Sequence, residues 1–406
     1  MRARAQQTDN IMAVGDKLKA VIEVFVSALK LGLTSFGGPV AHLGYFHDEY
    51  VRRRRWLVEE SYAELVALCQ LLPGPASSQF GIAVGTMRAG IPGGIVSWLG
   101  FTLPSALIMT CFALFMKGAG IDPDAGWLHG LKIVAVAIVA QAVIAMGQKL
   151  APERVRATMA LAAAALALLW RPAASQVAII TAAGIAGIFL FRDKVKGNGP
   201  GLKSGVGLRT GAICLAVFFV FLILFPLVRH ATGNRWIAVA DSFYRSGSLV
   251  FGGGHVILPL LEREVVPPAW VSAGEFLAGY GAAQALPGPL FTFTAYLGAM
   301  MGGAGGAALA IGVIFLPAYL LIIGALPFWG RLRGMPRVQG AVAGINAGVV
   351  GILVAALYLP LWTSSIKAPA DFALAAILFG MLVFWKLPPW CAVIAGAAGG
   401  MLLTFL

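Results

Sequence analysis

Two identical tripeptides interrupt long apolar stretches of the chain and are its strongest candidates for chemistry. They are Pro73-Gly74-Pro75 and Pro287-Gly288-Pro289. Each proline removes a backbone N–H donor and clashes with the preceding turn, so a helix breaks there. The break creates a new helix N-terminus, whose unpaired N–H groups and positive dipole end attract anions. We therefore predict two broken helices that bind an anion; the simpler alternative is a proline kink that serves packing alone.

Residues just past the breaks could cap the new helix or hold an oxygen of the anion. They are Ala76, Ser77, Ser78 and Gln79 after the first break, and Leu290, Phe291, Thr292 and Phe293 after the second.

A second paired feature is the glycine doublet in Phe36-Gly37-Gly38 and Phe251-Gly252-Gly253. Glycines at a helix end permit positive φ and let main-chain N–H groups converge on an anion. Close packing against a neighbouring helix is the alternative. We count Ser35, which precedes the first doublet, among the candidate substrate-binding residues.

Lys30 and Arg245 each lie about two turns before a glycine doublet, inside an apolar segment. A charge there costs at least about 2.5–3.5 kcal/mol on insertion scales, so it usually faces a cavity or pathway. The pair could seat a dianion; the alternative is that each side chain reaches back to the membrane surface. Removal of either cation is expected to abolish transport.

Three amides and a histidine complete the candidate site. Gln70 and Gln284 lie three residues before each Pro-Gly-Pro and could donate to an oxygen, or to another helix. Asn346 serves either packing or substrate contact. His255 follows the second glycine turn and could titrate near neutral pH, although a surface or capping role is the simpler explanation.

The sequence contains no motif for metal binding, nucleotide binding or catalysis. There is no HExxH, Walker A lysine motif, Rossmann glycine fingerprint or Cys/His cluster, and the four cysteines are scattered. We expect no metal, no cofactor and no enzymatic activity. Uphill transport would need an ion gradient, with protons as the candidate coupling ion, or a separate subunit.

The composition identifies the elements that carry these residues. Of 406 residues, 59% are hydrophobic and 12% charged, against about 25% charged in soluble domains. The apolar runs are long enough to span a bilayer, and the 51 glycines suit closely packed membrane helices. The net charge of +13 fits basic cytoplasmic loops and a field that attracts anions. We expect a multi-pass protein of the bacterial inner membrane that contacts lipid and no nucleic acid; a homo-oligomer stays open.

We predict an all-α protein with about 10–13 membrane segments. Its candidate segments are 18–38, 61–88, 91–116, 127–149, 155–170, 175–191, 209–229, 236–256, 272–300, 303–330, 338–360, 371–385 and 388–406. The division we expect is an N-terminal arm at 1–16, a first repeat at 17–191, a linker with an extra membrane helix at 192–235, and a second repeat at 236–406.

The two halves repeat one another. Lys30 matches Arg245 at an offset of 215 positions, and Trp56 and Gln70 match Trp270 and Gln284 at 214. Duplicated halves with interrupted segments indicate a secondary transporter. Residues 52–55 are four arginines, whereas 262–264 read Glu-Arg-Glu, and this contrast favours an inverted second half. The number of membrane crossings in the first half also predicts inverted halves if segment 61–88 crosses the membrane once. If that segment enters the membrane and returns to the same side, the number predicts parallel halves.

Several strings also carry a family resemblance. They are Ser35-Phe36-Gly37-Gly38-Pro39 with His42, Arg54-Arg55-Trp56-Leu57, Gln70-Leu71-Leu72-Pro73-Gly74-Pro75-Ala76-Ser77-Ser78-Gln79, Phe251-Gly252-Gly253-Gly254-His255 and Leu286-Pro287-Gly288-Pro289. The chain resembles the chromate transporter family from about residue 20 to 405. The resemblance implies export of chromate, with sulfate as the similar ion, and chromate resistance. Gly254 stands where the first half has Pro39, so the two turns differ.

The sequence therefore predicts a secondary-active exporter of tetrahedral oxyanions, with the substrate held between the halves. A passive oxyanion channel and an uptake carrier for sulfate-like anions are the alternatives, because the same residues could serve either.

Overall fold

The computed structural model describes residues 2–120, 125–170, 175–191, 202, 205–332 and 334–405, with side chains from residue 16 onward except 39 and 40. Within these residues the protein is built from helices and contains no strand. Five helical segments are long and apolar enough to cross a membrane. The chain is thus an all-α, multi-pass membrane protein, as predicted.

The two repeats contain the same series of helices, apart from two additional short helices in the second. The first comprises α1 (Arg2–Thr34), α2 (Gly38–Phe46) with a π-helical turn (His47–Arg53), α3 (Glu59–Leu71), α4 (Ala76–Gly118), α5 (Gly126–Leu150), α6 (Arg154–Leu169) and α7 (Ser175–Leu190). The second comprises α9 (Arg235–Leu249), α10 (Ile257–Val265), α11 (Ala273–Ala283), α12 (Phe293–Ala325), α13 (Trp329–Leu332), α14 (Pro336–Ala356), α15 (Thr363–Ser365), α16 (Pro369–Val383) and α17 (Pro389–Leu403). Helix α8 (Leu208–Thr232) joins them.

The predicted arm at 1–16 is continuous with α1, and the side chains of 1–15 lie outside the described residues. The polar junction at 192–204 also lies outside them, apart from residue 202.

Helices α4 and α12 each bend sharply at a glycine. Gly90 and Gly303 have positive φ, of 69° and 63°. The bend divides α4 into α4a (76–88) and α4b (91–118), and α12 into α12a (293–301) and α12b (304–325). The Ser97 hydroxyl donates to the Gly81 carbonyl at 2.7 Å, so α4a and α4b lie side by side in opposite directions. The predicted segment ends at 88 and 300 are confirmed.

Each repeat contains two helical hairpins that enter the molecule and turn back. In the first repeat, α1 and the π-helical turn meet through Lys30 and Glu49, and α3 and α4a meet through the rings of Tyr62 and Phe80, 5.2 Å apart. The glycine doublet forms the tip of the first hairpin and Pro73-Gly74-Pro75 the tip of the second. The second repeat has the same pair of hairpins, with Phe276 against Phe293, 5.1 Å apart, in the second of them.

Helix ends gather at two opposite rims of the molecule. At the first rim, Arg88 pairs with Glu23 at 3.3 Å, and the Trp329 indole donates to Glu64 at 2.5 Å. At the second rim, the Lys117 ammonium donates to the Met300 carbonyl at 3.0 Å. His129 lies 2.8 Å from Asp371 at the same rim. Helices α4b, α5, α12b and α14 connect the two rims.

Equivalent helices of the two repeats run in opposite directions. The hydroxyl of Tyr319 in α12b donates to the Ile91 carbonyl at 3.1 Å, whereas Lys117 at the other end of α4b reaches Met300. Helix α4b therefore begins where α12b ends. An inverted repeat requires this antiparallel arrangement, because a parallel repeat would align the two helices.

The inverted orientation of the repeats was predicted correctly, but the number of membrane crossings used to predict it was wrong. We expected inverted halves only if 61–88 crosses once, yet α3 and α4a double back. The predicted number of crossings was wrong because α1 and α2 also form a returning hairpin, whereas the sequence suggested that this region crosses the membrane once. Two returning hairpins in each half leave the direction of α4b unchanged.

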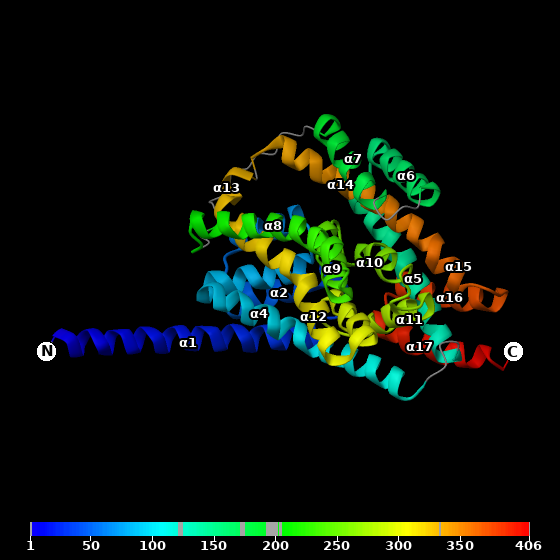
Figure 1. Cartoon of the computed structure of the whole chain (residues 1–406), viewed down its shortest axis with the longest axis horizontal. Helices are drawn as coiled ribbons and strands as arrows, with labels where there is room; N and C mark the ends of the chain where they lie inside the picture. The colour runs from blue at the N-terminus through cyan, green and yellow to red at the C-terminus, as the bar shows by residue number, and fades with distance from the viewer. Residues whose placement is uncertain are drawn as a thin grey trace.

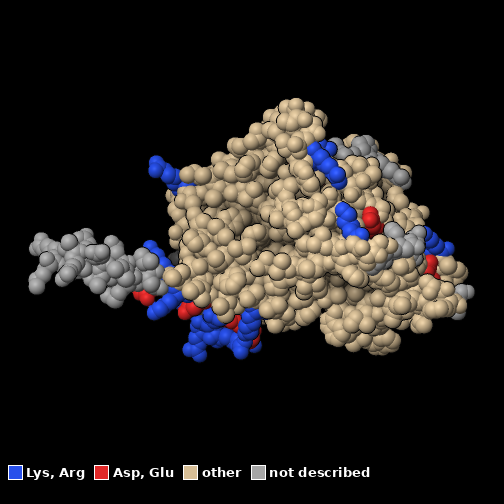
Figure 2. Space-filling view, turned by 60° about the horizontal axis from the view of Figure 1, so that its bottom comes forward, with Lys and Arg blue, Asp and Glu red and all other residues tan. Residues whose placement is uncertain are grey.

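The remaining helices surround this centre. Figure 1 shows α6 and α7 beside α14 on one flank, α8 beside α12, and α16 and α17 beside α5. Close approach is possible because small residues face one another, as where Gly187 lies against Gly340 and Gly130 against Gly396. The surface is largely uncharged, with Lys and Arg confined to a few clusters on the face shown in Figure 2.

Candidate functional site

The four hairpin tips meet at the centre of the molecule. The Gly74 N–H donates to the Val250 carbonyl at 2.7 Å, and the Gly288 N–H donates to the Ser35 carbonyl at 2.8 Å. These two bonds are related by the repeat, since Val250 and Gly288 are the counterparts of Ser35 and Gly74. Each Pro-Gly-Pro tip is thereby docked on the glycine turn of the other repeat.

Local sequence explains the shape of the tips. Gly74 and Gly288 have φ values of +119° and +88°, and Gly37 and Gly252 have +93° and +77°. Residues with a side chain rarely adopt these values, so glycine is required. Prolines flank Gly74 and Gly288 and end the preceding helix. The Ser105 hydroxyl donates to the Pro287 carbonyl and fixes the second tip to α4b.

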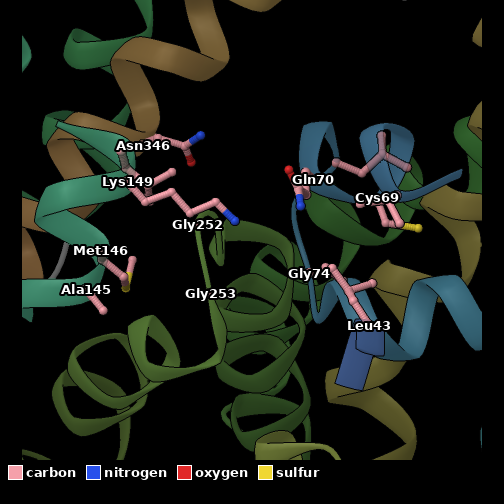
Figure 3. Close-up of a pocket in the computed structure, with 14 residues that line it drawn as sticks. Leu43, Cys69, Gln70, Gly74, Ala145, Met146, Lys149, Gly252, Gly253 and Asn346 are labelled. Carbon is pink, nitrogen blue, oxygen red and sulfur yellow. The ribbon is translucent and has the colours of Figure 1, made fainter. Parts of the chain in front are cut away.

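A cavity of about 160 Å³ lies where the Pro-Gly-Pro tip of the first repeat meets the glycine turn of the second. Its described lining is Leu43, Val66, Cys69, Gln70, Leu72, Gly74, Ala76, Ala145, Met146, Lys149, Leu150, Gly252, Gly253 and Asn346. We call it the hinge cavity. Figure 3 shows Lys149 and Asn346 on one side, Gln70 and Gly74 on the other, and the Gly252–Gly253 turn between them.

Lys149 provides the positive charge of the hinge cavity. It comes from the last turn of α5, and its side chain extends toward the Gly252 turn (Figure 3). No Asp or Glu is among the described lining residues, so no carboxylate of the lining neutralises this ammonium. Lys149 was not predicted from the sequence, because a lysine at a helix end, close to Pro152, has the pattern of an ordinary membrane-surface residue.

Polar groups without partners surround the same space. The Asn346 side-chain oxygen is buried and has no hydrogen-bond partner among the described residues. Helix α4 begins at Ala76 after Pro75, and no side chain caps this N-terminus. Ala76, the first residue of α4, lines the cavity, so the positive dipole end of this helix lies at the cavity wall, which suits a negative ligand. An anion held there would meet Lys149 across the cavity.

The residues after the first break pack inward, away from the hinge cavity. Ser77, Ser78 and Gln79 are buried and are absent from its described lining. The Gln79 side-chain amide donates to the Pro73 carbonyl at 2.8 Å and so braces the tip. Ser78 Oγ has no partner among the described residues. After the second break, the Thr292 hydroxyl donates to the Pro289 carbonyl at 2.9 Å.

A second, smaller cavity of about 80 Å³ lies at the other pair of tips. Its described lining is Gly37, Gly38, Ile138, Gln141, His255, Ala283, Gln284, Leu286, Gly288, Leu290 and Pro389. We call it the inner cavity. It contains the counterparts of Gln70, Gly74 and the glycine turn, but no Lys or Arg among its described residues. The predicted site residues are thus divided between two cavities.

Lys30 and Arg245 do not line either cavity. Lys30 pairs with Glu49 at 2.7 Å, and Glu49 also accepts from Arg54 at 2.6 Å. Arg245 pairs with Asp241 at 2.8 Å and with Glu264 at 2.9 Å. The structure therefore does not bring the two cations together as a seat for a dianion.

The two ion pairs instead hold the first hairpin of each repeat closed. Ser27 and Ser242 donate to the same glutamates, at 3.4 Å and 2.6 Å. Glu49 and Glu264 are 215 positions apart, the same offset that relates Lys30 to Arg245. This shared offset could have indicated from the sequence that Lys30 pairs with Glu49 and that Arg245 pairs with Glu264.

Inverted repeats with broken helices and a cavity at their junction define the class of the protein as a transporter-like membrane protein. A family model described as "Chromate transporter" matches residues 22–188 and again 237–401. The chain belongs to the chromate transporter family.

Relatives with that name extend over most of the chain. A "Probable chromate transport protein" of Synechococcus elongatus is 28% identical and covers 94% of this chain and 95% of its own. A "Chromate transport protein" of Pseudomonas aeruginosa is 28% identical over 82% of this chain and 79% of its own. One of Cupriavidus metallidurans is 26% identical over 91% and 90%. No solved structure matches the chain.

Proposed function

We propose that the protein exports chromate, or a similar tetrahedral oxyanion such as sulfate, from the bacterial cytoplasm across the inner membrane, and thereby confers chromate resistance. The observation that carries this proposal is the hinge cavity. Its described lining contains Lys149 but no carboxylate, and the lysine faces an uncapped helix N-terminus. An oxyanion would accept from Lys149, from Gln70 and from the N–H groups that begin α4. Family membership supports chromate as the substrate.

The distribution of basic residues indicates how the protein is oriented in the membrane. Exposed arginines gather near the first rim; they include Arg52, Arg53, Arg55, Arg154, Arg209 and Arg337. Fewer exposed cations, among them Lys117, Arg235 and Lys367, lie near the second rim. Lys and Arg concentrate in cytoplasmic loops, so the first rim is assigned to the cytoplasm. The lining of the hinge cavity includes Val66, two residues from Glu64 at this rim, so we infer that it receives its anion from the cytoplasm.

The membrane potential can supply the energy for export. Moving one charge across 100 mV is worth about 2.3 kcal/mol, so a dianion that leaves a cell with a negative interior gains about 4.6 kcal/mol per 100 mV. This corresponds to a concentration ratio of about 10³. Protons remain the alternative coupling ion, and inverted repeats are an architecture in which secondary carriers alternate access to the two sides of the membrane.

Flux of radiolabelled chromate into inverted membrane vesicles tests the proposal. We expect uptake against a gradient when the vesicle interior is positive, inhibition by excess sulfate, and loss of uptake when an ionophore collapses the potential. A pH gradient imposed alone then tests proton coupling. A channel would accumulate chromate to the same ratio under the potential, so a flux that follows the potential without saturating would identify a passive channel, whereas saturable flux with counterflow would identify a carrier. Absence of uptake in vesicles that contain the folded protein would refute the proposed function.

A further inference from the structure

The inner cavity repeats the construction of the hinge cavity without its charge. Gln284 and Gly288 occupy the places of Gln70 and Gly74, and Gly37–Gly38 occupy the place of Gly252–Gly253. We propose that the inner cavity is a second, separate subsite for the same oxyanion and that it holds the ion with uncharged donors alone. The inference rests on the proposed function and adds a second position on the route through the protein.

Donors for an anion are present in the inner cavity. The Gln284 side-chain nitrogen is buried and makes no hydrogen bond of good geometry among the described residues, although it lies near the Tyr280 hydroxyl. His255 Nδ1 lies 2.8 Å from the Tyr280 hydroxyl. A tyrosine that donates to Nδ1 leaves the ring proton on Nε2, where it can be donated to a ligand. The Gln141 side-chain amide donates to the Leu382 carbonyl at 3.4 Å and adds a third donor group, with a second N–H available.

The size of the inner cavity also suits a small polar ligand. Its volume is about 80 Å³, several times the roughly 10–15 Å³ that a single water requires. A buried donor without a partner is unfavourable, so water or an oxyanion in this cavity would satisfy Gln284. Because charged donors are absent from the described lining, the ion would be bound more weakly than beside Lys149.

One face of α5 links the two cavities. Ile138 and Gln141 line the inner cavity, and Ala145, Met146 and Lys149 line the hinge cavity. These positions are spaced by three or four residues, except for the adjacent pair 145–146, so they share one side of the helix. Met146 packs against the Gly252–Gly253 turn between the cavities. Its flexible side chain can move aside without strain in the helix.

The order of the two subsites explains how an ion could be captured and still released. A pathway must bind its ion well enough to admit it and weakly enough, or at several sites, to let it leave. The charged hinge cavity faces the cytoplasmic rim and captures the ion. The uncharged inner cavity accepts it next and lowers the affinity before release.

Equilibrium binding of radiolabelled chromate to the purified full-length chain in lipid nanodiscs tests this inference. We expect two chromate ions per chain at saturation in the wild type and one in Gln284→Leu. The variant should also lose at least tenfold in maximal flux, with the half-saturating cytoplasmic chromate concentration within twofold of the wild type. Gln148→Leu is the matched control, because Gln148 is exposed on α5 and absent from both described linings; it should bind two ions.

Two outcomes would overturn the second subsite: a single ion bound by the wild type, or two ions still bound by folded Gln284→Leu. If Gln284→Leu does not fold, Gln284→Met retains the length of the side chain without its donor and replaces it in both measurements. Absence of any saturable chromate binding to the wild type is a different result, which refutes the proposed function itself.

Discussion

Replacing Lys149 with glutamine removes the positive charge of the hinge cavity while keeping a side chain of similar length. Two unit charges 4 Å apart interact by about 1 kcal/mol in bulk water and about 4 kcal/mol at an effective dielectric constant of 20. A dianion doubles both values. Because Lys149 is exposed to the cavity, the lower part of the range applies, and we expect a loss of about 2–4 kcal/mol.

This loss corresponds to a rise of about 30- to 1,000-fold in the half-saturating chromate concentration. The assay is chromate flux into inverted vesicles over a range of concentrations, normalised to the amount of folded protein. Lys149→Arg should retain most of the affinity because it keeps the charge. Lys19→Gln is the control, since it removes the same charge from an exposed position on α1 outside the described cavity lining. A half-saturating concentration unchanged within threefold in Lys149→Gln would refute the role of this lysine.

Three further predictions concern the scaffold. Arg245→Ala leaves Glu264 without a basic partner, whereas Asp241 keeps Arg229 at 2.9 Å. We expect the fold to be destabilised by about 3 kcal/mol, the lower end for a broken buried ion pair, seen as a lower melting temperature. A fully stable protein without flux would instead assign Arg245 to the transport pathway. Gly288→Ala should abolish folding or flux, because the added Cβ would lie 2.8 Å from Ser105 Oγ at a position with positive φ. Gly38→Ala is the comparison: its Cβ has open space around it, so the variant should lose only the backbone strain of about 1–2 kcal/mol in folding stability. Reporter fusions should place the N-terminus in the cytoplasm and the C-terminus outside, and both ends on one side would contradict the inverted fold.

The breaks in the helices were predictable because their causes are local. Proline cannot continue a helix and glycine allows positive φ, so Pro73, Gly74 and Gly90 mark their own positions in the sequence. The repeat was predictable for the same reason, since these residues recur at a nearly constant offset.

The partners of these breaks were not predictable from local rules. A positive charge inside an apolar segment indicates that something must compensate it, but not whether the compensation is a substrate or a carboxylate. Lys30 and Arg245 were therefore assigned to the substrate, whereas Glu49 and Glu264 hold them. Lys149 was not predicted as a site residue because it lines the cavity only through its position beside the Gly252–Gly253 turn, which is more than one hundred residues away in the sequence.

The exchange of backbone hydrogen bonds between the tips has a consequence for any shorter version of this protein. A polypeptide with one repeat alone would expose the Gly74 N–H and the Ser35 carbonyl at a depth where lipid offers no substitute. It could satisfy them only by meeting a second such polypeptide inserted into the bilayer the other way up. Severing the chain at the junction should therefore yield two fragments that are unstable separately and recover the intact architecture when they are produced together.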